Sequence, residues 1–365
     1  MKKAPPSPLL MRLDAHIKAE KDAFQAGCLK AERAGLFGRL GFFDEARAAI
    51  DALQKEFAGR PNARVSAWMQ IAEGWLSFYQ EDYDVARDHF ARAKALSDAF
   101  GDTRLIALSA TWLANIAYLN DDFEEMGRCL EIGTKAASPG DHLTRARLSM
   151  VVAMACFFAD LYEAANSWSI RARNHAAALN DESMLSALNF NMTIRRVYYL
   201  AELSVRGLAL DSTETMARIG IESTHVFDRL LGISLVGNWN HPFEAQLNSA
   251  CQRYKEAIAV YEVHIRTLPR NLEISKAMFL ADNAWCYANV GQAERAVDVA
   301  HEAEGALRAD MSLQDRCLAL GRLRQLFEKV GEHKLADRYA HLETDSNAAL
   351  QSLRERALLA LASFS

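Results

Sequence analysis

Apolar residues recur along the chain at helical spacing, and the pattern is clearest around Ala86. Phe90 and Ala93 follow it at offsets of +4 and +7, and Tyr83 precedes it by one turn. Side chains with this spacing share one face of an α-helix. Gly74 lies in the preceding apolar stretch, where glycine is unfavourable unless two helices approach closely. The pattern therefore predicts two helices joined by a tight turn.

The same offsets recur in register at seven places. The seven centres are Ala46, Ala86, Met126, Ala165, Ala257, Ala296 and Ala336. The residues five positions earlier suit a turn, being glycine or polar: Gly41, Glu81, Asp121, Asp160, Gln252, Gly291 and Gly331. Three positions before the centre stands an aromatic residue in the first four repeats and at Tyr254. The centres are about 40 residues apart, and the gap between Ala165 and Ala257 would hold two repeats, so we expect eight hairpins, one of them degenerate.

This repeat resembles the tetratricopeptide repeat (TPR) family, whose consensus places a small residue, a turn glycine, an aromatic residue and an alanine at these offsets. The resemblance covers residues 27–343, with a period near 40 residues where the family consensus has 34. It implies an all-α fold, a right-handed α-α superhelix (a TPR-like solenoid) of about eight helical hairpins with terminal capping helices. Long-period versions are similar to the sensor arms of bacterial regulators.

We expect one solenoid over residues 1–365. Its segments are an N-terminal capping helix at 8–26, repeats one to four at 27–180, a degenerate repeat at 181–237, repeats six to eight at 238–343, and a C-terminal capping helix at 346–363. The stripe from Leu9 to Phe24 predicts the first helix. In the degenerate repeat, a helix from Glu182 to Leu203 precedes a second that begins near Asp211, and the stretch 237–242 is expected to end it.

Composition favours a reduced, cytoplasmic protein. The net charge is −5 and no long basic run occurs, so nucleic acid and membrane are not the expected partners. The N-terminus lacks the apolar core of a signal peptide, and the longest apolar run, 150–159, is too short to span a bilayer. The six cysteines are scattered without a CxxC pair, which favours buried thiols over disulfides or metal.

No motif for catalysis is found: there is no phosphate-binding glycine loop, no HExxH and no GxSxG. The ten histidines are dispersed, and no pair of them has metal-site spacing. His301 with Glu302 and Glu304 reads better as a solvated helix face than as a ligand set. We therefore expect no enzyme activity, no cofactor and no metal.

The TPR resemblance implies that the first helices of successive hairpins line a concave groove. Its register places a set of aromatic and polar residues there: Trp75, Tyr79, Asn115, Tyr118, Phe158, Gln246, Trp285 and Asn289. Asn189 and Arg196 on the degenerate repeat could bind a peptide carboxylate or backbone, or could hydrogen-bond an irregular joint. For Trp75, Tyr79, Phe158 and Trp285, packing between helices is the favoured alternative to partner contact. The carboxylate clamp of co-chaperone members is not supported, because Ile71, Trp75 and Val151 occupy key positions of that clamp.

Two functions fit this pattern. The first is a non-enzymatic scaffold that binds a protein or peptide segment in its concave groove. The alternative is a regulatory sensor arm, similar to the repeat arms of bacterial diguanylate cyclases or transcription regulators but without an output domain. The tail at 349–358 resembles the connecting helix of such proteins. The partner and the oligomeric state are left open.

Overall fold

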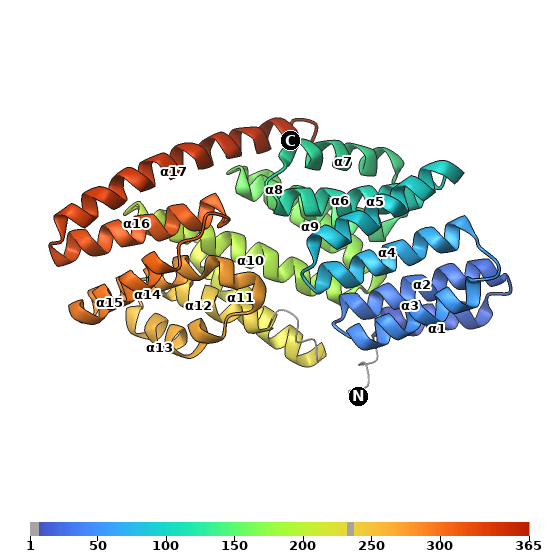
Figure 1. Cartoon of the computed structure of the whole chain (residues 1–365), viewed down its shortest axis with the longest axis horizontal. Helices are drawn as coiled ribbons and strands as arrows, with labels where there is room; N and C mark the ends of the chain where they lie inside the picture. Colours follow the sequence, from blue (N-terminus) through green and yellow to red (C-terminus); the bar gives the residue numbers. More distant parts are fainter. Residues whose placement is uncertain (1–6, 232–236, 365) are drawn as a thin grey trace. The chain divides into compact units, whose positions relative to one another are not determined.

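The computed structural model describes residues 7–231 and 237–364, and in these residues it contains helices and turns but no strand. The all-α prediction is confirmed. The elements are α1 (Pro8–Ala19), α2 (Ala23–Arg39), α3 (Phe43–Phe57), α4 (Ala63–Tyr79), α5 (Tyr83–Phe100), α6 (Thr103–Leu119), α7 (Phe123–Ala136), α8 (His142–Phe158), α9 (Tyr162–Leu179), α10 (Glu182–Val205), α11 (Thr213–Leu231), α12 (Gly237–Ala250), α13 (Tyr254–His264), the 3-10 turns η1 (Ile265–Thr267) and η2 (Arg270–Ser275), α14 (Lys276–Asn289), α15 (Ala293–Gly305), α16 (Leu313–Val330) and α17 (His333–Ala360) (Figure 1).

The tight turn inside each repeat has one backbone conformation. The residue five positions before every centre has positive φ, at Gly41 (83°), Glu81 (68°), Asp121 (56°), Asp160 (60°), Gln252 (61°), Gly291 (82°) and Gly331 (83°). Left-handed backbone reverses the chain in a few residues, and glycine adopts it without strain. The aromatic residue two positions later is the first residue of the second helix, as at Tyr83 in α5.

The repeat centres lie where the two helices of a hairpin cross. Six of the seven are fully buried, and Ala336 is 4% exposed. Gly74 on α4 faces the ring of Phe90 on α5, and a Cβ at this glycine would lie 2.7 Å from the ring. The close approach expected from the sequence is therefore present, because a side chain on Gly74 would overlap that ring.

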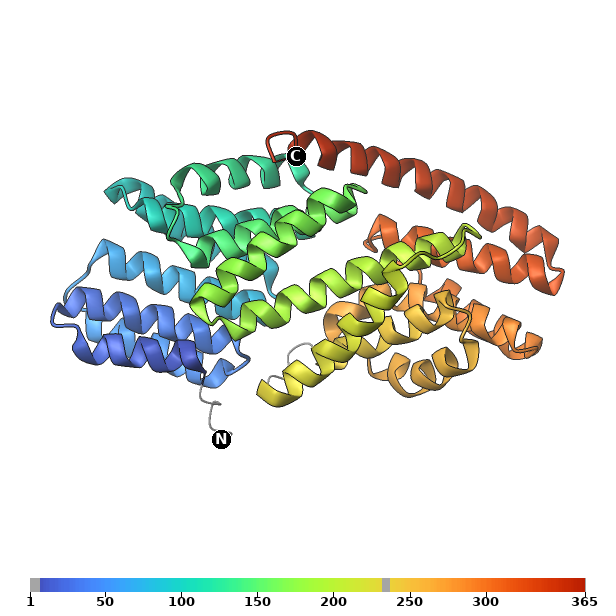
Figure 2. The same ribbon diagram turned by 180° about the vertical axis from the view of Figure 1, so that it is seen from behind.

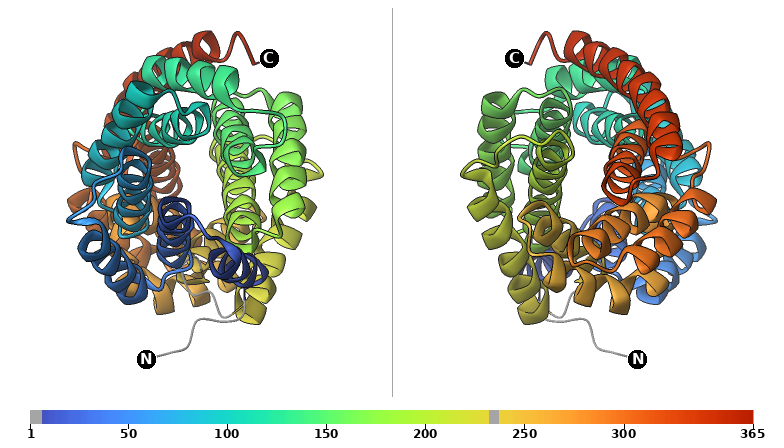
Figure 3. Two further views of the ribbon diagram at one scale, coloured as in Figure 1. Left: turned by 90° about the vertical axis from the view of Figure 1, so that its right-hand side faces the viewer. Right: turned by 90° about the vertical axis from the view of Figure 1, so that its left-hand side faces the viewer.

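The chain forms two compact units, and each is described by itself. Unit 1 contains the described residues 7–188, 231 and 356–364, and unit 2 contains 189–230 and 237–355. In unit 1 the hairpins follow one another in chain order from α2 to α9, and the first helices α2, α4, α6 and α8 pack successively (Figure 3). They form an inner layer that is rich in buried aromatic residues.

Unit 1 includes a segment from the far end of the sequence. The Phe364 carbonyl accepts a hydrogen bond from Trp168 Nε1 at 2.9 Å, and the Arg356 guanidinium pairs with Glu124 at 2.6 Å. Gly127 on α7 faces Ala360, and a Cβ at this glycine would lie 3.2 Å from the Ala360 carbonyl oxygen, which is a tight contact. Helices α7 and α9 are therefore covered by residues 356–364.

Unit 2 continues the hairpin pattern from the second part of α10 onward. Helices α10 and α11 follow one another as a hairpin, drawn in yellow-green and yellow (Figure 2). Gly220 on α11 lies directly against Thr193 on α10, so that a Cβ there would clash with the threonine side chain. One continuous apolar core then runs through α12, α14 and α16, and it includes the stacked rings of Phe327 and Tyr339.

Three local expectations differ from the structure. Helix α1 ends at Ala19, and Phe24 belongs to α2, where Asp22 caps the new helix. The stretch 237–242 lies within α12 and does not end a helix: Pro242 lacks one backbone donor, which removes a single intrahelical hydrogen bond. Helix α17 is continuous where two separate helices were expected, because no proline or turn glycine interrupts it.

None of the helices in the described residues is long and apolar enough to cross a bilayer. All six cysteines are free thiols, and five of them are buried.

Candidate functional site

The inner layer of unit 1 is built around an aromatic cluster on α4 and α6. The Trp112 ring lies 6.1 Å from Trp75 and 6.2 Å from Tyr79, centroid to centroid. Trp75 also packs against Gly35 on α2, where any side chain would clash with its ring. The two tryptophans are almost fully buried, so they hold the inner helices together.

A buried arginine sits on this cluster. The Arg147 guanidinium lies 3.9 Å above the centre of the Trp112 ring and donates a hydrogen bond to the Tyr79 hydroxyl at 3.1 Å. Arg147 is 3% exposed, and burial lowers the pKa of its guanidinium. Among the described residues no carboxylate lies within 4.0 Å of it. It is therefore a buried cation held by an aromatic face and a hydroxyl group.

A second buried arginine has a carboxylate partner. Arg39 Nη2 lies 2.6 Å from Asp181 Oδ2, and both side chains are 2% exposed. The same nitrogen donates to Ser183 Oγ at 2.9 Å. Burial alone would raise the pKa of the Asp181 carboxyl, but the Arg39 charge and the hydrogen bonds that the carboxylate accepts hold that pKa below its usual range. Asp181 is therefore ionised at neutral pH.

Next to these groups is a cavity of about 220 Å³. Its polar lining comes from Arg12, Glu32, Arg39, Arg104, Asp141 and His142, and its apolar lining includes Leu9, Leu13 and Trp75. Burial raises the pKa of the Glu32 carboxyl, although Arg104 at 3.7 Å opposes the shift. A cavity of this size can hold one or two side chains of a ligand.

Several buried polar atoms on successive inner helices have no hydrogen-bond partner. They include Arg39 Nε on α2, Trp75 Nε1 on α4, Ser109 Oγ and Asn115 Oδ1 on α6, and Arg147 Nε on α8. Buried polar groups in proteins are nearly always paired, and an unpaired one costs about 1 to 3 kcal/mol. These unpaired donors and acceptors make the inner helices of unit 1 a candidate binding region.

Five of the ten residues that the sequence analysis assigned to the groove lie in unit 1. Trp75, Tyr79 and Asn115 belong to the inner layer described above. Tyr118 is buried and donates a hydrogen bond to the Met154 carbonyl at 3.4 Å. Phe158 is buried with its ring stacked on Phe123, at 5.1 Å between centroids. Both side chains therefore contact another helix of unit 1; packing between helices was the alternative given for Phe158 but not for Tyr118.

The other five predicted residues lie in unit 2. Asn189 and Arg196 are half-buried on α10, and Gln246 on α12 is buried with its Oε1 unpartnered. Trp285 and Asn289 are half-buried on α14, where Asn289 Nδ2 donates to the Trp285 carbonyl at 2.8 Å.

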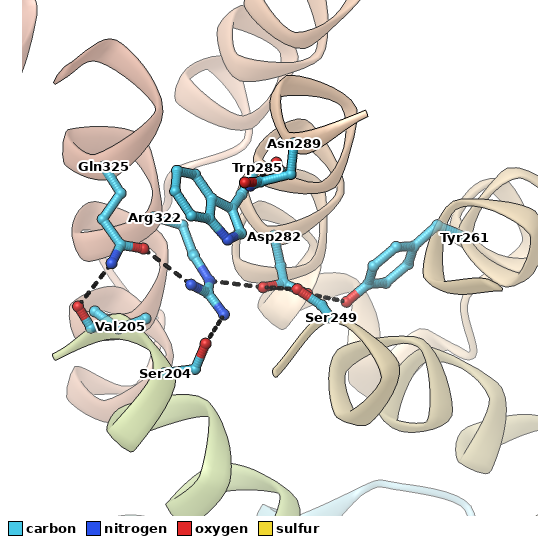
Figure 4. Close-up of polar contacts among 9 residues, drawn as sticks. All are labelled: Ser204, Val205, Ser249, Tyr261, Asp282, Trp285, Asn289, Arg322 and Gln325. Atoms are coloured by element: carbon cyan, nitrogen blue, oxygen red, sulfur yellow. Dashed lines mark hydrogen bonds and ion pairs between the residues drawn. The ribbon is translucent and has the colours of Figure 1, made fainter. Parts of the chain in front are cut away.

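Trp285 borders a buried polar network that the sequence did not reveal (Figure 4). Arg322 Nε lies 2.7 Å from Asp282 Oδ1, and both side chains are 2% exposed. Asp282 also accepts hydrogen bonds from Ser249 and Tyr261, each at 2.9 Å. The other guanidinium nitrogens donate to Gln325 Oε1 and Ser204 Oγ at 2.9 Å. Because its donors and acceptors are matched internally, this network stabilises unit 2 and is a weaker candidate for ligand binding.

Sequence reasoning missed Arg39, although the repeat register contains the signal. Arg39 precedes its centre Ala46 by seven positions, as Tyr79 precedes Ala86 and Asn289 precedes Ala296. Applying the groove register to the first repeat as well would have selected it. Asp181 carried no such signal, because it reads as the residue before a helix, and its carboxylate does accept the Met184 N–H.

Comparison with known proteins supports the fold. No protein-family model and no curated protein sequence matches the chain. The crystal structure of Rap protein complexed with Competence and Sporulation Factor is similar, with a TM-score of 0.56 and 15% identity, and the match covers 94% of this chain and 98% of that one. The TPR domain of P58(IPK) matches with a TM-score of 0.30 and 15% identity over 88% of this chain and 84% of that one. The similarity to Rap protein, together with the repeated hairpins, shows that this chain has a TPR-like fold.

Proposed function

We propose that this protein is a non-enzymatic binding protein that holds a protein or peptide segment against the inner helices of unit 1. The observation that carries the proposal is the set of unpartnered buried polar atoms on the inner helices, among them Arg39 Nε on α2, Asn115 Oδ1 on α6 and Arg147 Nε on α8. A peptide offers backbone carbonyls and N–H groups at regular spacing, so a single extended segment could pair with several of them.

The charge of the inner layer favours an acidic or carboxylate-bearing segment. Arg147 has no carboxylate within ion-pair distance among the described residues, and a buried cation without a counter-ion is costly. Arg12 lines the adjacent cavity and donates to the backbone carbonyl of Leu179 at 3.1 Å. A guanidinium group binds a carboxylate through two parallel hydrogen bonds, which gives geometric specificity as well as affinity.

The size of the cavity supports a regulatory form of this function. About 220 Å³ accommodates part of a short segment and is too small for a folded domain. The similar Rap structure was solved with a bound factor. We propose as a second candidate that a short peptide acts as a signal and changes the conformation of the protein. Small-angle scattering with and without peptide separates the two: a scaffold keeps its dimensions, and a sensor changes them.

The binding proposal is tested with synthetic peptide libraries that have free carboxyl termini, using the full chain and fluorescence polarisation. Asn115→Ala and Arg147→Gln are expected to weaken selected peptides at least tenfold, about 1.4 kcal/mol. Arg87→Ala and Arg92→Ala on the exposed side of α5 serve as controls and should bind like wild type. If these controls abolish binding while the inner variants bind normally, the inner layer is not the site.

The predicted residues of unit 2 are kept as a second proposed contact surface. Asn189, Arg196, Gln246, Trp285 and Asn289 can be tested with the same peptides, and Arg196→Ala is the first variant to measure. Loss of binding in that variant, with normal binding in Arg147→Gln, would transfer the proposal to unit 2.

A further inference from the structure

Two histidines and a glutamate meet between α11 and α12 in unit 2. Glu244 Oε2 lies 3.8 Å from His225 Nε2 and 3.7 Å from His241 Nδ1. One nitrogen or oxygen atom from each of the three residues lies within 4.8 Å of the others. Within the described parts of the chain, these residues form the one group of three such ligands at this distance.

The distances suit a transition-metal ion better than a hydrogen-bonded cluster. Zinc binds histidine nitrogen at about 2.0–2.1 Å and carboxylate oxygen at about 2.0–2.2 Å, so two ligands of one tetrahedral ion lie roughly 3.3–3.5 Å apart. The separations of 3.7 and 3.8 Å are too long for direct hydrogen bonds and a few tenths of an ångström longer than this ligand spacing. Coordination of one ion therefore requires each of these pairs to approach by only a few tenths of an ångström.

One of the three potential ligand atoms makes no hydrogen bond. His225 Nε2 is buried and has no hydrogen-bond partner. His241 and Glu244 are three residues apart on α12 and therefore share one face of that helix. The ring of His264 stacks on His241, with centroids 4.0 Å apart and planes 10° apart, which restricts the rotation of the His241 ring.

We propose that His225, His241 and Glu244 bind one divalent transition-metal ion, with zinc as the ion best suited to two imidazoles and a carboxylate. Three protein ligands leave a fourth position for water. Helix α11 ends at Leu231 and α12 begins at Gly237, so the ion joins two consecutive helices. Metal binding therefore stabilises unit 2. The inference uses no residue of the proposed peptide site and stands independently of it.

The test uses the full chain, stripped of metal with EDTA and titrated with zinc against a chromophoric chelator. Wild type is compared with His225→Gln and with Glu244→Gln, which keeps the size of the side chain. His301→Gln is the matched control, because His301 Nδ1 lies 3.6 Å from Glu304 Oε2 with the same three-residue spacing but belongs to no such three-ligand group in the described residues.

Wild type and His301→Gln are expected to bind one zinc ion, and the two site variants more than tenfold more weakly. Zinc should raise the melting temperature of the first two proteins and leave that of the site variants unchanged, because a ligand that binds the folded state stabilises it. Equal melting of all four proteins in EDTA shows that the variants fold.

Three results would overturn the proposal. The first is wild-type protein that does not bind zinc, and the second is undiminished binding in both site variants. The third is zinc binding that survives in His225→Gln and is lost in Cys251→Ser, since Cys251 is the half-buried thiol of the chain and would then be the ligand.

Discussion

Arg39 and Asp181 form a buried ion pair across 142 positions of sequence. Their charged atoms are 2.6 Å apart, and both side chains are 2% exposed. Arg39 is the last residue of α2, and Asp181 immediately precedes α10. The pair therefore joins the start of unit 1 to the residues that follow its last complete hairpin.

Removing one member of this pair should destabilise the protein strongly. Arg39→Met leaves the Asp181 carboxylate buried without a counter-charge, and breaking a buried pair in this way costs about 3 to 5 kcal/mol. The double variant Arg39→Met, Asp181→Leu should recover much of that loss, because no uncompensated charge is left. Urea denaturation measures both. Arg60→Met, at an exposed arginine, is the control. Equal stability of the single variant and wild type would show that the pair does not form.

The repeat centres should not tolerate larger side chains. Ala86→Leu, Ala165→Leu and Ala296→Leu are each expected to lower the free energy of unfolding by about 1 to 3 kcal/mol, because these alanines are fully buried where helices cross. Ala58→Leu at an exposed position should cost little. Thermal melting followed by far-UV circular dichroism tests this, and similar melting of all four variants would contradict the register.

At turn positions with left-handed backbone, removing a glycine should destabilise the protein and introducing one should stabilise it. Gly291→Ala is expected to cost about 1 kcal/mol, because alanine is strained at φ 82°, whereas Glu81→Gly should gain a similar amount by relieving strain at φ 68°. Gly305→Ala is the control: it has space for a Cβ and no positive φ, so it should be neutral or slightly stabilising. Differential scanning calorimetry would disprove the explanation if Gly291→Ala and Gly305→Ala shifted the melting temperature alike.

Acidification should destabilise unit 1 through a histidine pair. His142 Nδ1 and His175 Nδ1 are 2.9 Å apart, so one nitrogen must donate and the other must accept. Burial lowers the pKa of His175, and the neighbouring His142 and Arg145 lower it further. The unfolded chain then binds more protons than the folded one, so stability is full above the unfolded pKa of about 6.5 and is lost as the pH falls below it.

His175→Gln should flatten this pH dependence between about pH 7.5 and 5.5, and His16→Gln, at an exposed position on α1, should leave it unchanged. Urea midpoints measured across the range give the slopes. A His175→Gln slope equal to that of wild type would show that another group titrates.

The sequence predicted those parts of the fold that depend on local backbone geometry. Turn residues such as Glu81 and centres such as Ala86 recur in register, because each hairpin must reverse and cross in the same way. The same register placed Trp75 and Asn115 on the first helices of their hairpins, α4 and α6. Long-range partners could not be predicted in this way. Nothing near Arg39 in sequence indicates Asp181, and His225 meets His241 because two separate helices place them together.

The covering of α7 and α9 by residues 356–364 has a consequence for biosynthesis. Residues up to 188 leave the ribosome first, but the segment that pairs with Trp168 and Glu124 follows only after unit 2 has been translated. At about 5 to 20 residues per second, this delay is on the order of 10 to 30 seconds. During that time the surfaces of α7 and α9 that contact residues 356–364 are uncovered on the nascent chain, and a chaperone or a neighbouring polypeptide can bind there before that segment is made.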